Sequence, residues 1–355
     1  MKILVIGPSD TKSRGGMAVV IHDIRNSKVL NKSYDIDIFP SYIDGNIAVR
    51  LLYSIFGYLK FLTLYKKYDL FHIHAASYGS TFRKRLYLRT IKKSGKRVIV
   101  HIHGAKYIEF YEKLSNRRKR QVTEFLKAAD LVIALSESWK EKFEQIFGLK
   151  NCAVLSNGID TDIYAGAACN VSLHSNEFVL LGRLGERKGA FDLVNAVQIA
   201  VKLNPGIRIR MAGDGEVDRV REMVRRNNLE KNIEVSGWID FEEKIELLKK
   251  SAVLVLPSYN EGLPMAVLEG MASGKAIIST TVGAIPEVVK KENGILIEPG
   301  DIPALAQALV KCSRDPAMLI KMSENNMQKA VELFSTERMH EQLLKYYGDV
   351  LNVCR

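Results

Sequence analysis

The chain contains 355 residues, which is long for a single hydrophobic core and therefore predicts two domains. Hydrophobic residues make up 47% and charged residues 26% of it, a composition that excludes intrinsically disordered and fibrous proteins. The four cysteines are scattered without a Cys-x-x-Cys pair, which argues against a disulfide framework or a zinc cluster and suits a reducing compartment.

The positive charge is concentrated in the first half of the chain. Residues 1–170 contain 28 Lys and Arg against 15 Asp and Glu, whereas the net charge of the whole chain is +12. Such asymmetry predicts that the first half faces an anionic surface, either nucleic acid or lipid headgroups. A basic face that contacts only water is the simpler alternative. No helix-turn-helix, zinc or RNA-recognition signature accompanies the charge, which argues against nucleic acid.

The chain begins with a short apolar run, Ile3–Ile6, that is too short for the hydrophobic region of a signal peptide. We interpret it as a first strand, and similar runs follow it at intervals filled by helix-length segments. This alternation predicts a parallel sheet covered by helices on both faces. The strand-like runs of the first half span residues 3–6, 36–39, 70–73, 98–101, 131–134 and 153–155.

A glycine pair, Gly15-Gly16, follows the first strand and opens the next predicted helix. Paired glycines let the backbone approach a ligand closely, and the N-terminus of a helix presents N–H groups to an anion. The pair is therefore a candidate binding site, although a tight turn would explain it equally well.

Residues 47–65 form the most apolar segment, interrupted by Arg50 and Lys60. A membrane-spanning helix needs about 20 apolar residues with few charges, so we expect none here. Two interpretations stay open, an interfacial helix that rests on a membrane and a buried core helix.

Two histidine pairs, His72 with His74 and His101 with His103, each share one face of a predicted strand. Each strand supplies only two ligands, and no cysteine or carboxylate is near in sequence, so we expect no metal site. We favour a single binding histidine, His103, that forms hydrogen bonds with sugar hydroxyls.

Basic clusters occupy residues 83–97 and 117–120. Each basic residue near an anionic leaflet contributes about 1 kcal/mol of binding. We therefore expect peripheral attachment of the first half to an anionic membrane surface.

A stretch without periodicity, residues 157–176, separates the two halves, and the predicted domains span residues 1–165 and 166–337. A last helix, about 338–355, is expected to pack back on the first domain. Two doubly wound domains that face each other would leave an interdomain cleft at the carboxyl ends of both sheets, where ligands of such sheets bind. The strand-like runs of the second half span residues 178–181, 207–212, 233–235, 253–256, 276–279 and 294–297.

The first strand of the second half leads into a basic loop with Arg183 and Lys188. Two cations at a strand end would neutralise a diphosphate and stabilise the charge that develops on it as a leaving group. The glycines Gly182, Gly185 and Gly189 do not follow the Gly-x-Gly-x-x-Gly fingerprint, so binding of a nicotinamide cofactor is unsupported.

The most specific segment, residues 257–274, predicts a strand end, a polar loop and a helix that starts near Pro264. The backbone amides of Gly262 and Leu263 would face a phosphate at the helix N-terminus. Glu261 in the loop and Glu269 within the helix would repel that phosphate unless each bound another part of the ligand. Sugar and ribose hydroxyls, which donate hydrogen bonds to carboxylates, are the natural partners.

Taken in order, these motifs resemble the retaining glycosyltransferases of family 4, which have the GT-B fold of two facing Rossmann-like domains. The resemblance covers nearly the whole chain, with two departures. Members often have two glycines where this chain has Gly283-Ala284, and the aromatic residue common near the last crossover helix is replaced at residues 334–337. The matching motifs are Gly15-Gly16, His103-Gly104, Asn157 to Asp160, Gly182-Arg183 with Lys188, Gly213 to Gly215, Glu261 with Glu269, and Gly283 to Glu287.

The resemblance implies a role for each candidate residue. It implies that Arg183 and Lys188 contact the donor diphosphate, with Gly15 and Gly16 on its other side. It also implies that Glu269 binds the ribose and that Trp238 and Ile239 line the base. Glu261, with Gly262 and Leu263, would meet the donor sugar and its phosphate, and His103 would contact the transferred sugar.

The function implied is that of a retaining, hexosyltransferase-type enzyme in surface polysaccharide assembly (capsule, exopolysaccharide or O-antigen). It would transfer a sugar from a nucleoside diphosphate sugar to a lipid-linked saccharide, without a metal or other cofactor. We expect it in the cytoplasm, at the inner face of the cell membrane. A sugar-nucleotide epimerase or a phosphorylase of the same fold is the alternative.

Overall fold

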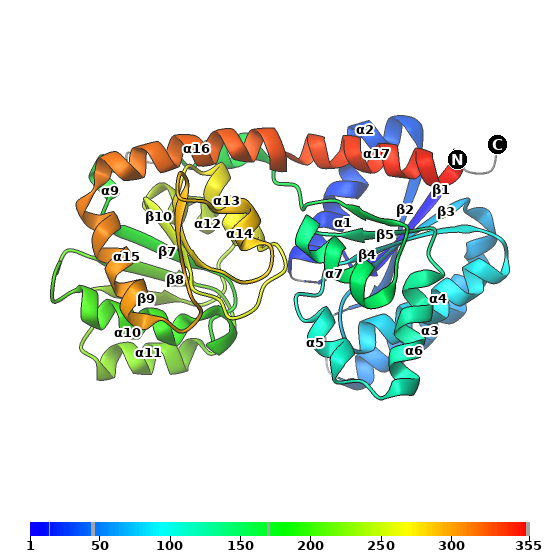
Figure 1. Ribbon diagram of the computed structural model, residues 1–355, viewed down its shortest axis with the longest axis horizontal. Coiled ribbons are helices and arrows are strands. Elements are labelled where there is room, and N and C mark those ends of the chain that lie inside the picture. The colour runs from blue at the N-terminus through cyan, green and yellow to red at the C-terminus, as the bar shows by residue number, and fades with distance from the viewer. Residues whose placement is uncertain (14, 44–46, 169–170, 353–355) are drawn as a thin grey trace. The chain divides into compact units, whose positions relative to one another are not determined.

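The computed structural model describes residues 1–13, 15–43, 47–168 and 171–352. The chain divides into two compact units, each built on a six-stranded parallel sheet (Figure 1). Unit 1 comprises Met1–Gly158 and Thr336–Arg355, and unit 2 comprises Ile159–Ser335. The predicted α/β fold with two doubly wound domains is confirmed.

Unit 1 carries its six strands in the order β2-β1-β3-β4-β5-β6, so the chain reverses direction across the sheet between β1 and β3. The strands are β1 (Lys2–Pro8), β2 (Asp35–Tyr42), β3 (Leu70–Ala75), β4 (Arg97–Ile102), β5 (Leu131–Ala134) and β6 (Cys152–Val154). The helices are α1 (Gly16–Asn26), α2 (Lys28–Ser33), α3 (Ile47–Leu64), α4 (Gly79–Lys93), α5 (Tyr107–Glu112), α6 (Asn116–Lys127), α7 (Glu137–Phe147) and α17 (Thr336–Asn352), with a short 3-10 turn, η1 (Tyr65–Lys67).

The two faces of this sheet bury different sets of side chains because successive strand residues point to opposite sides. On one face Ile3 and Val5 pack against α1 and against Leu343 and Tyr347 of α17. On the other face Phe71 contacts Phe61 of α3, with ring centroids 6.1 Å apart. The final helix of the chain therefore belongs to the core of unit 1.

Unit 2 has the strand order β12-β11-β10-β7-β8-β9, in which the reversal falls between β7 and β10. Its strands are β7 (Glu177–Leu181), β8 (Arg208–Ala212), β9 (Ile233–Ser236), β10 (Val253–Leu256), β11 (Ala276–Thr280) and β12 (Gly294–Ile297). Its helices are α8 (Thr161–Ala165), α9 (Val171–His174), α10 (Ala190–Ala200), α11 (Val217–Arg226), α12 (Phe241–Lys249), α13 (Met265–Ala272), α14 (Ile285–Val288), α15 (Ile302–Arg314) and α16 (Pro316–Phe334), with a 3-10 turn, η2 (Glu186–Lys188).

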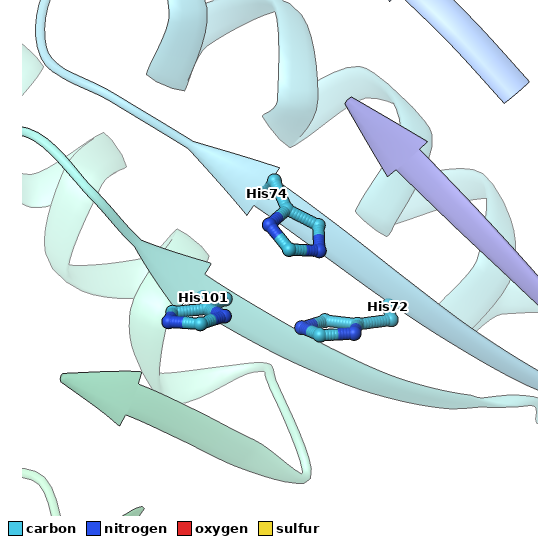
Figure 2. Close-up of side chains that lie close together, drawn as sticks. All are labelled: His72, His74 and His101. Atoms are coloured by element: carbon cyan, nitrogen blue, oxygen red, sulfur yellow. The ribbon is translucent and has the colours of Figure 1, made fainter. Parts of the chain in front are cut away.

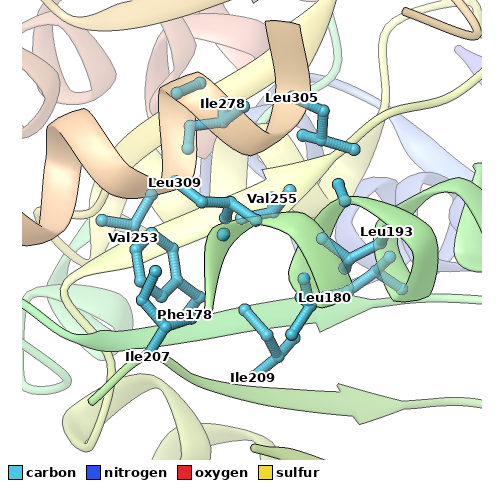
Figure 3. Packing of buried hydrophobic residues seen from close by; sticks show 14 of the residues in the cluster. Phe178, Leu180, Leu193, Ile207, Ile209, Val253, Val255, Ile278, Leu305 and Leu309 are labelled. Atoms are coloured by element: carbon cyan, nitrogen blue, oxygen red, sulfur yellow. The ribbon is translucent and has the colours of Figure 1, made fainter. Parts of the chain in front are cut away.

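The core of unit 2 lies between its sheet and the helices α10 and α15 (Figure 3). Phe178 and Leu180 alternate toward this side of β7, where Leu193 of α10 and Leu309 of α15 cover them. All four side chains are fully buried, which stabilises the fold by roughly 1.5–3 kcal/mol for each such side chain. A rigid sheet thus holds the loops at its carboxyl edge.

The structure places the unit boundary between Gly158 and Ile159, a few residues before the predicted one. The reason is α8, because Tyr164 on this helix donates a hydrogen bond to Glu269 of unit 2 at 2.9 Å. Among the described cysteines, Cys152 and Cys312 are free thiols, whereas Cys169 and Cys354 lie outside the described residues.

The apolar helix α3 is largely exposed, which bears on one of the two interpretations that the sequence left open. Phe61 is fully buried, whereas Phe56 is 67% and Leu59 is 53% exposed. The interpretation of α3 as a core helix is therefore wrong. Within the described ranges, no helix combines the length and the apolar character that would be needed to cross a bilayer.

Candidate functional site

The predicted donor-site residues of unit 2 follow β7 and β10, the neighbouring strands at which the sheet order reverses. At such a point the loops after the two strands lead to opposite faces and leave a crevice for a ligand. Arg183 and Lys188 follow β7, and Glu261 follows β10. The fold thus brings together residues more than 70 positions apart, as the hydrogen bond from Arg187 to the Asn260 carbonyl shows at 3.0 Å.

The basic loop after β7 is braced by the loop after β8. The backbone N–H of Leu184 donates a hydrogen bond to the Asp214 carbonyl at 2.7 Å. The Leu184 carbonyl accepts one from the N–H of Glu216 at 2.8 Å. Arg183 is exposed and lines a cavity of about 320 Å³ together with Gly185 and Gly215. Within the described part of the chain Arg183 forms no ion pair, so its charge is available to a ligand.

Lys188 contacts Glu261 directly. Its Nζ lies 2.6 Å from Oε1 of Glu261, and the two side chains are only 12% and 7% exposed. Ser258 donates a further hydrogen bond to the same carboxylate oxygen at 2.9 Å, and Arg187 lies 3.5 Å from it. The carboxylate and the cation are therefore held in fixed positions before any ligand arrives.

Arg187 is a member of this site that the sequence analysis missed. It carries a guanidinium beside Glu261 and Asn260, yet only its neighbour Lys188 was singled out. The signal was present, since Arg187 and Lys188 lie together in one short loop after a strand.

The loop after β10 leads into α13, which begins at Met265. Pro264 is the N-cap residue with an extended ψ of 125°, so the predicted helix start near Pro264 is confirmed to within one residue. Gly274, with φ of +65°, follows the C-cap residue, as expected for a left-handed helix stop. Gly262 and Leu263 thus lie directly before the helix N-terminus.

Gly283 holds this loop in place from the neighbouring strand end. Its φ is +59°, and a Cβ at this position would collide with the carbonyl oxygen of Glu261. Ala284 donates its backbone N–H to the Gly262 carbonyl at 2.9 Å. Packing therefore requires glycine at position 283. At position 284 alanine is sufficient, because the loop is held there by a backbone hydrogen bond.

Glu269 has partners that the sequence did not reveal. Lys244 of α12 lies 2.7 Å from its Oε1, and Tyr164 of α8 donates to the same oxygen at 2.9 Å. These contacts hold the carboxylate predicted to bind ribose hydroxyls. The structure does not bring Trp238 and Ile239 into this cluster, because they follow β9 at the edge of the sheet, and Trp238 is 55% exposed.

In unit 1 the two His-x-His pairs meet on one face of the sheet. The register pairs His74 of β3 with His101 of β4, and Figure 2 shows the imidazoles of His72, His74 and His101 close together. Nδ1 of His74 lies 2.8 Å from Nε2 of His103, close enough for a hydrogen bond. His103 is thus positioned by a second histidine. This contact was not predicted, because the two histidine pairs lie in or next to different strands that are far apart in the sequence.

Burial keeps these histidines neutral. It lowers the pKa of His103 to about 3 and, with a smaller effect from His103, lowers that of His72 to about 3. The pKa values of His74 and His101 are also well below normal, mainly through burial and secondarily through neighbouring imidazoles. A neutral His103 acts as a hydrogen-bonding group for a ligand and carries no positive charge.

Nitrogen atoms of His72, His74 and His101 lie within 4.8 Å of one another, a grouping that could hold a metal ion. The sequence did not predict this group of three, because each strand was expected to supply only two ligands. The register of β3 and β4 brings the two pairs together. That the reaction needs no metal stays a prediction.

Comparison with known proteins matches a family model to each of the two units. Residues 15–163 match the family model described as Glycosyltransferase Family 4, and residues 175–315 match the model described as Glycosyl transferases group 1. Sucrose-phosphate synthase from Thermosynechococcus elongatus has the same fold, with a TM-score of 0.82 at 19% identity over 99% of both chains. Anabaena HepE in complex with UDP-glucose gives a TM-score of 0.77 at 21% identity, covering 98% of this chain and 100% of that one.

Two curated relatives illustrate the range of similar sequences. An Escherichia coli UDP-Gal:alpha-D-GlcNAc-diphosphoundecaprenol alpha-1,3-galactosyltransferase is 28% identical over 82% of this chain and 79% of its own length. The glycogen synthase of Mycobacterium tuberculosis is 26% identical over 62% of this chain, and the match spans 55%, or about half, of that protein. The fold and the matched regions define a glycosyltransferase of the GT-B class. The two models together match most of the chain, which supports a glycosyltransferase of the family 4 type.

Proposed function

We propose that the protein is a retaining glycosyltransferase that moves a hexosyl group from a nucleoside diphosphate sugar to a lipid-linked saccharide. The observation that carries this proposal is the charged cluster at the strand reversal of unit 2. No described carboxylate forms an ion pair with Arg183, and Nζ of Lys188 lies 2.6 Å from Oε1 of Glu261. A cation pair at this point suits a diphosphate, and the fixed carboxylate suits the hydroxyls of a sugar.

The role proposed for the cations is to stabilise the leaving group. When the bond between sugar and diphosphate breaks, negative charge develops on the departing phosphate, and preorganised cations lower that barrier. Retention rests on the family resemblance, in which the departing phosphate accepts the proton of the attacking hydroxyl on the same face of the sugar. No side-chain nucleophile is then required, and Glu261 and His103 position the sugar.

Three similar proteins support the donor and acceptor classes. HepE is known in complex with UDP and with UDP-glucose, which supports a nucleotide sugar as donor. The E. coli galactosyltransferase is named for a diphosphoundecaprenol acceptor, and WcaL of Salmonella typhimurium is described as a putative colanic acid biosynthesis glycosyltransferase. We therefore propose a role in surface polysaccharide assembly at the inner face of the cell membrane.

The donor proposal predicts that one nucleoside diphosphate, and its sugar conjugate, stabilises the fold. A ligand at about 100 times its Kd contributes roughly 2.7 kcal/mol, which raises Tm by several degrees. A thermal-shift panel of uridine, guanosine, adenosine and thymidine diphosphates and their hexose conjugates measures this. The proposal fails if no nucleotide shifts Tm. Release of free nucleoside diphosphate only with acceptor present distinguishes a transferase from an epimerase, and independence of added phosphate excludes a phosphorylase.

Membrane attachment predicts salt-sensitive flotation with anionic vesicles. Arg117 and Arg120 at the start of α6 are exposed, and each basic residue near an anionic surface adds about 1 kcal/mol of binding. We expect binding to phosphatidylglycerol vesicles at low salt and its loss at high salt, because ions screen such contacts. Vesicles of phosphatidylcholine alone are the control. Equal recovery with both vesicle types would contradict the prediction.

A further inference from the structure

A cavity of unit 1 lies where its sheet order reverses, between β1 and β3. It has a volume of about 1050 Å³ and is lined by residues that follow these strands, among them Gly15, Gly16 and Tyr78. The helices α3 and α4 form its other walls, and they are joined by a hydrogen bond of 2.7 Å between Tyr58 and Thr90. Such a position at the carboxyl edge of a parallel sheet is where ligands bind.

Three cations line one part of this cavity, Arg50, Arg83 and Lys84. Lys84 is only 1% exposed, and its ammonium group donates a hydrogen bond to the Ser41 hydroxyl, which in turn donates to the Gly7 carbonyl at 2.9 Å. Nε of Arg83 is buried without a hydrogen-bond partner. Among the described residues, no carboxylate pairs with any of the three cations.

A buried cation without a counter-charge is costly, since desolvation is not offset by an ion pair. Burial, together with the nearby charge of Arg83, holds the pKa of Lys84 well below its usual value. An anion in the cavity would reverse that effect and would also satisfy the free donor of Arg83. Phosphate fits best, because guanidinium and ammonium groups are its usual protein ligands.

An apolar wall of the cavity continues onto the exposed surface. Leu51, Ile55 and Leu59 of α3 line it, and each is at least 50% exposed. Leu86 of α4 faces the same cavity and is 48% exposed. Exposed apolar side chains that gather beside a cationic end indicate a ligand that is itself amphiphilic.

We propose that this cavity, the lipid-phosphate pocket, binds the phosphate or diphosphate of the lipid-linked acceptor. Arg50, Arg83 and Lys84 hold the phosphate, and the first units of the lipid chain lie along α3 and α4. The inference rests on the proposed function and names the part of the acceptor that unit 1 recognises. A free sugar phosphate would leave the apolar wall uncovered, and an uncharged lipid would leave the buried cations unpaired.

Calorimetric titration of the full chain with farnesyl diphosphate tests the pocket, with inorganic diphosphate and farnesol as half-ligands. We expect farnesyl diphosphate to bind more tightly than either half-ligand, because only it meets both the cations and the apolar wall. Replacing Lys84 by methionine, which keeps the apolar stem, or Arg83 by methionine is expected to weaken binding by roughly tenfold or more. Ile55→Ser is expected to weaken the binding of farnesyl diphosphate and to leave the binding of inorganic diphosphate unchanged.

The matched control is Arg89→Met, which removes an exposed cation of the same helix outside the pocket. It should keep wild-type affinity for farnesyl diphosphate. Equal affinity of the wild type and the Lys84 and Arg83 variants would overturn the proposal, as would no gain from the farnesyl chain. The thermal shift with nucleotides is measured in parallel. If nucleotides still raise Tm but farnesyl diphosphate does not bind, the pocket proposal is refuted and the proposed function is not.

Discussion

Replacing Lys188 by methionine is expected to lower kcat/KM for the nucleotide sugar by about two to three orders of magnitude, the usual effect of removing one preorganised charge-stabilising group. Its Nζ lies 2.6 Å from Glu261, and both side chains are nearly buried. The variant therefore loses the cation that is proposed to face the leaving diphosphate, and it leaves a buried carboxylate with Arg187, at 3.5 Å, as its remaining cation. Initial rates with the donor found in the thermal-shift panel measure the effect.

Lys202→Met is the matched control, since Lys202 is an exposed lysine of the same unit. It should retain wild-type kcat/KM. Urea unfolding of the Lys188 variant separates lost chemistry from a lost fold, because some destabilisation is expected from the weakened pairing of Glu261. A folded Lys188→Met protein with less than about a threefold loss would show that this lysine does not stabilise the leaving group.

The donor residues could be found from sequence because each follows directly on a buried strand. Once Val253–Leu256 and Phe178–Leu181 are assigned as strands, Glu261 and Arg183 must lie at the carboxyl edge of a parallel sheet. The distance between them in the chain does not matter, because the edge itself brings them together. For this reason the sequence alone predicts that the basic loop and the glutamate lie in one site.

Other contacts could not be predicted, because they depend on the register of strands and on helix packing. Tyr164 and Glu269 are 105 positions apart and meet only through the packing of α8 on α13. His74 and His101 share one face because β3 and β4 pair in one register, and a shift by one residue would separate them. The apolar pattern of α3 is the same for a core helix and for an interfacial one. Only the exposure of Phe56, which is 67%, argues against the core helix.

Acid is expected to destabilise unit 1 from about pH 6.5 downward, before most carboxylates titrate. His72, His74, His101 and His103 are neutral in the folded protein, because burial lowers their pKa values, to about 3 for His72 and His103. Below pH 6.5 these histidines bind protons in the unfolded chain but not in the folded protein. The free energy of unfolding is therefore highest above pH 6.5 and falls as the pH decreases toward the pKa values of the folded protein. Tyr347 of α17 and Lys84 of α4, which also face this cluster, do not supply a negative charge that would oppose the effect.

Each buried histidine is expected to cost about 1 kcal/mol for every pH unit below 6.5, so the cluster dominates the acid response near pH 5.5. His101→Leu tests this, because neither ring nitrogen of His101 has a hydrogen-bond partner among the described residues. The leucine variant should match or exceed wild-type stability at pH 7.5. At pH 5.5 it should gain about 1 kcal/mol more over the wild type, as measured by urea unfolding at both pH values. His22→Gln, at an exposed position on α1, should leave the pH dependence unchanged. If His101→Leu loses stability with pH as steeply as the wild type does, the imidazole of His101 is not a source of the acid sensitivity.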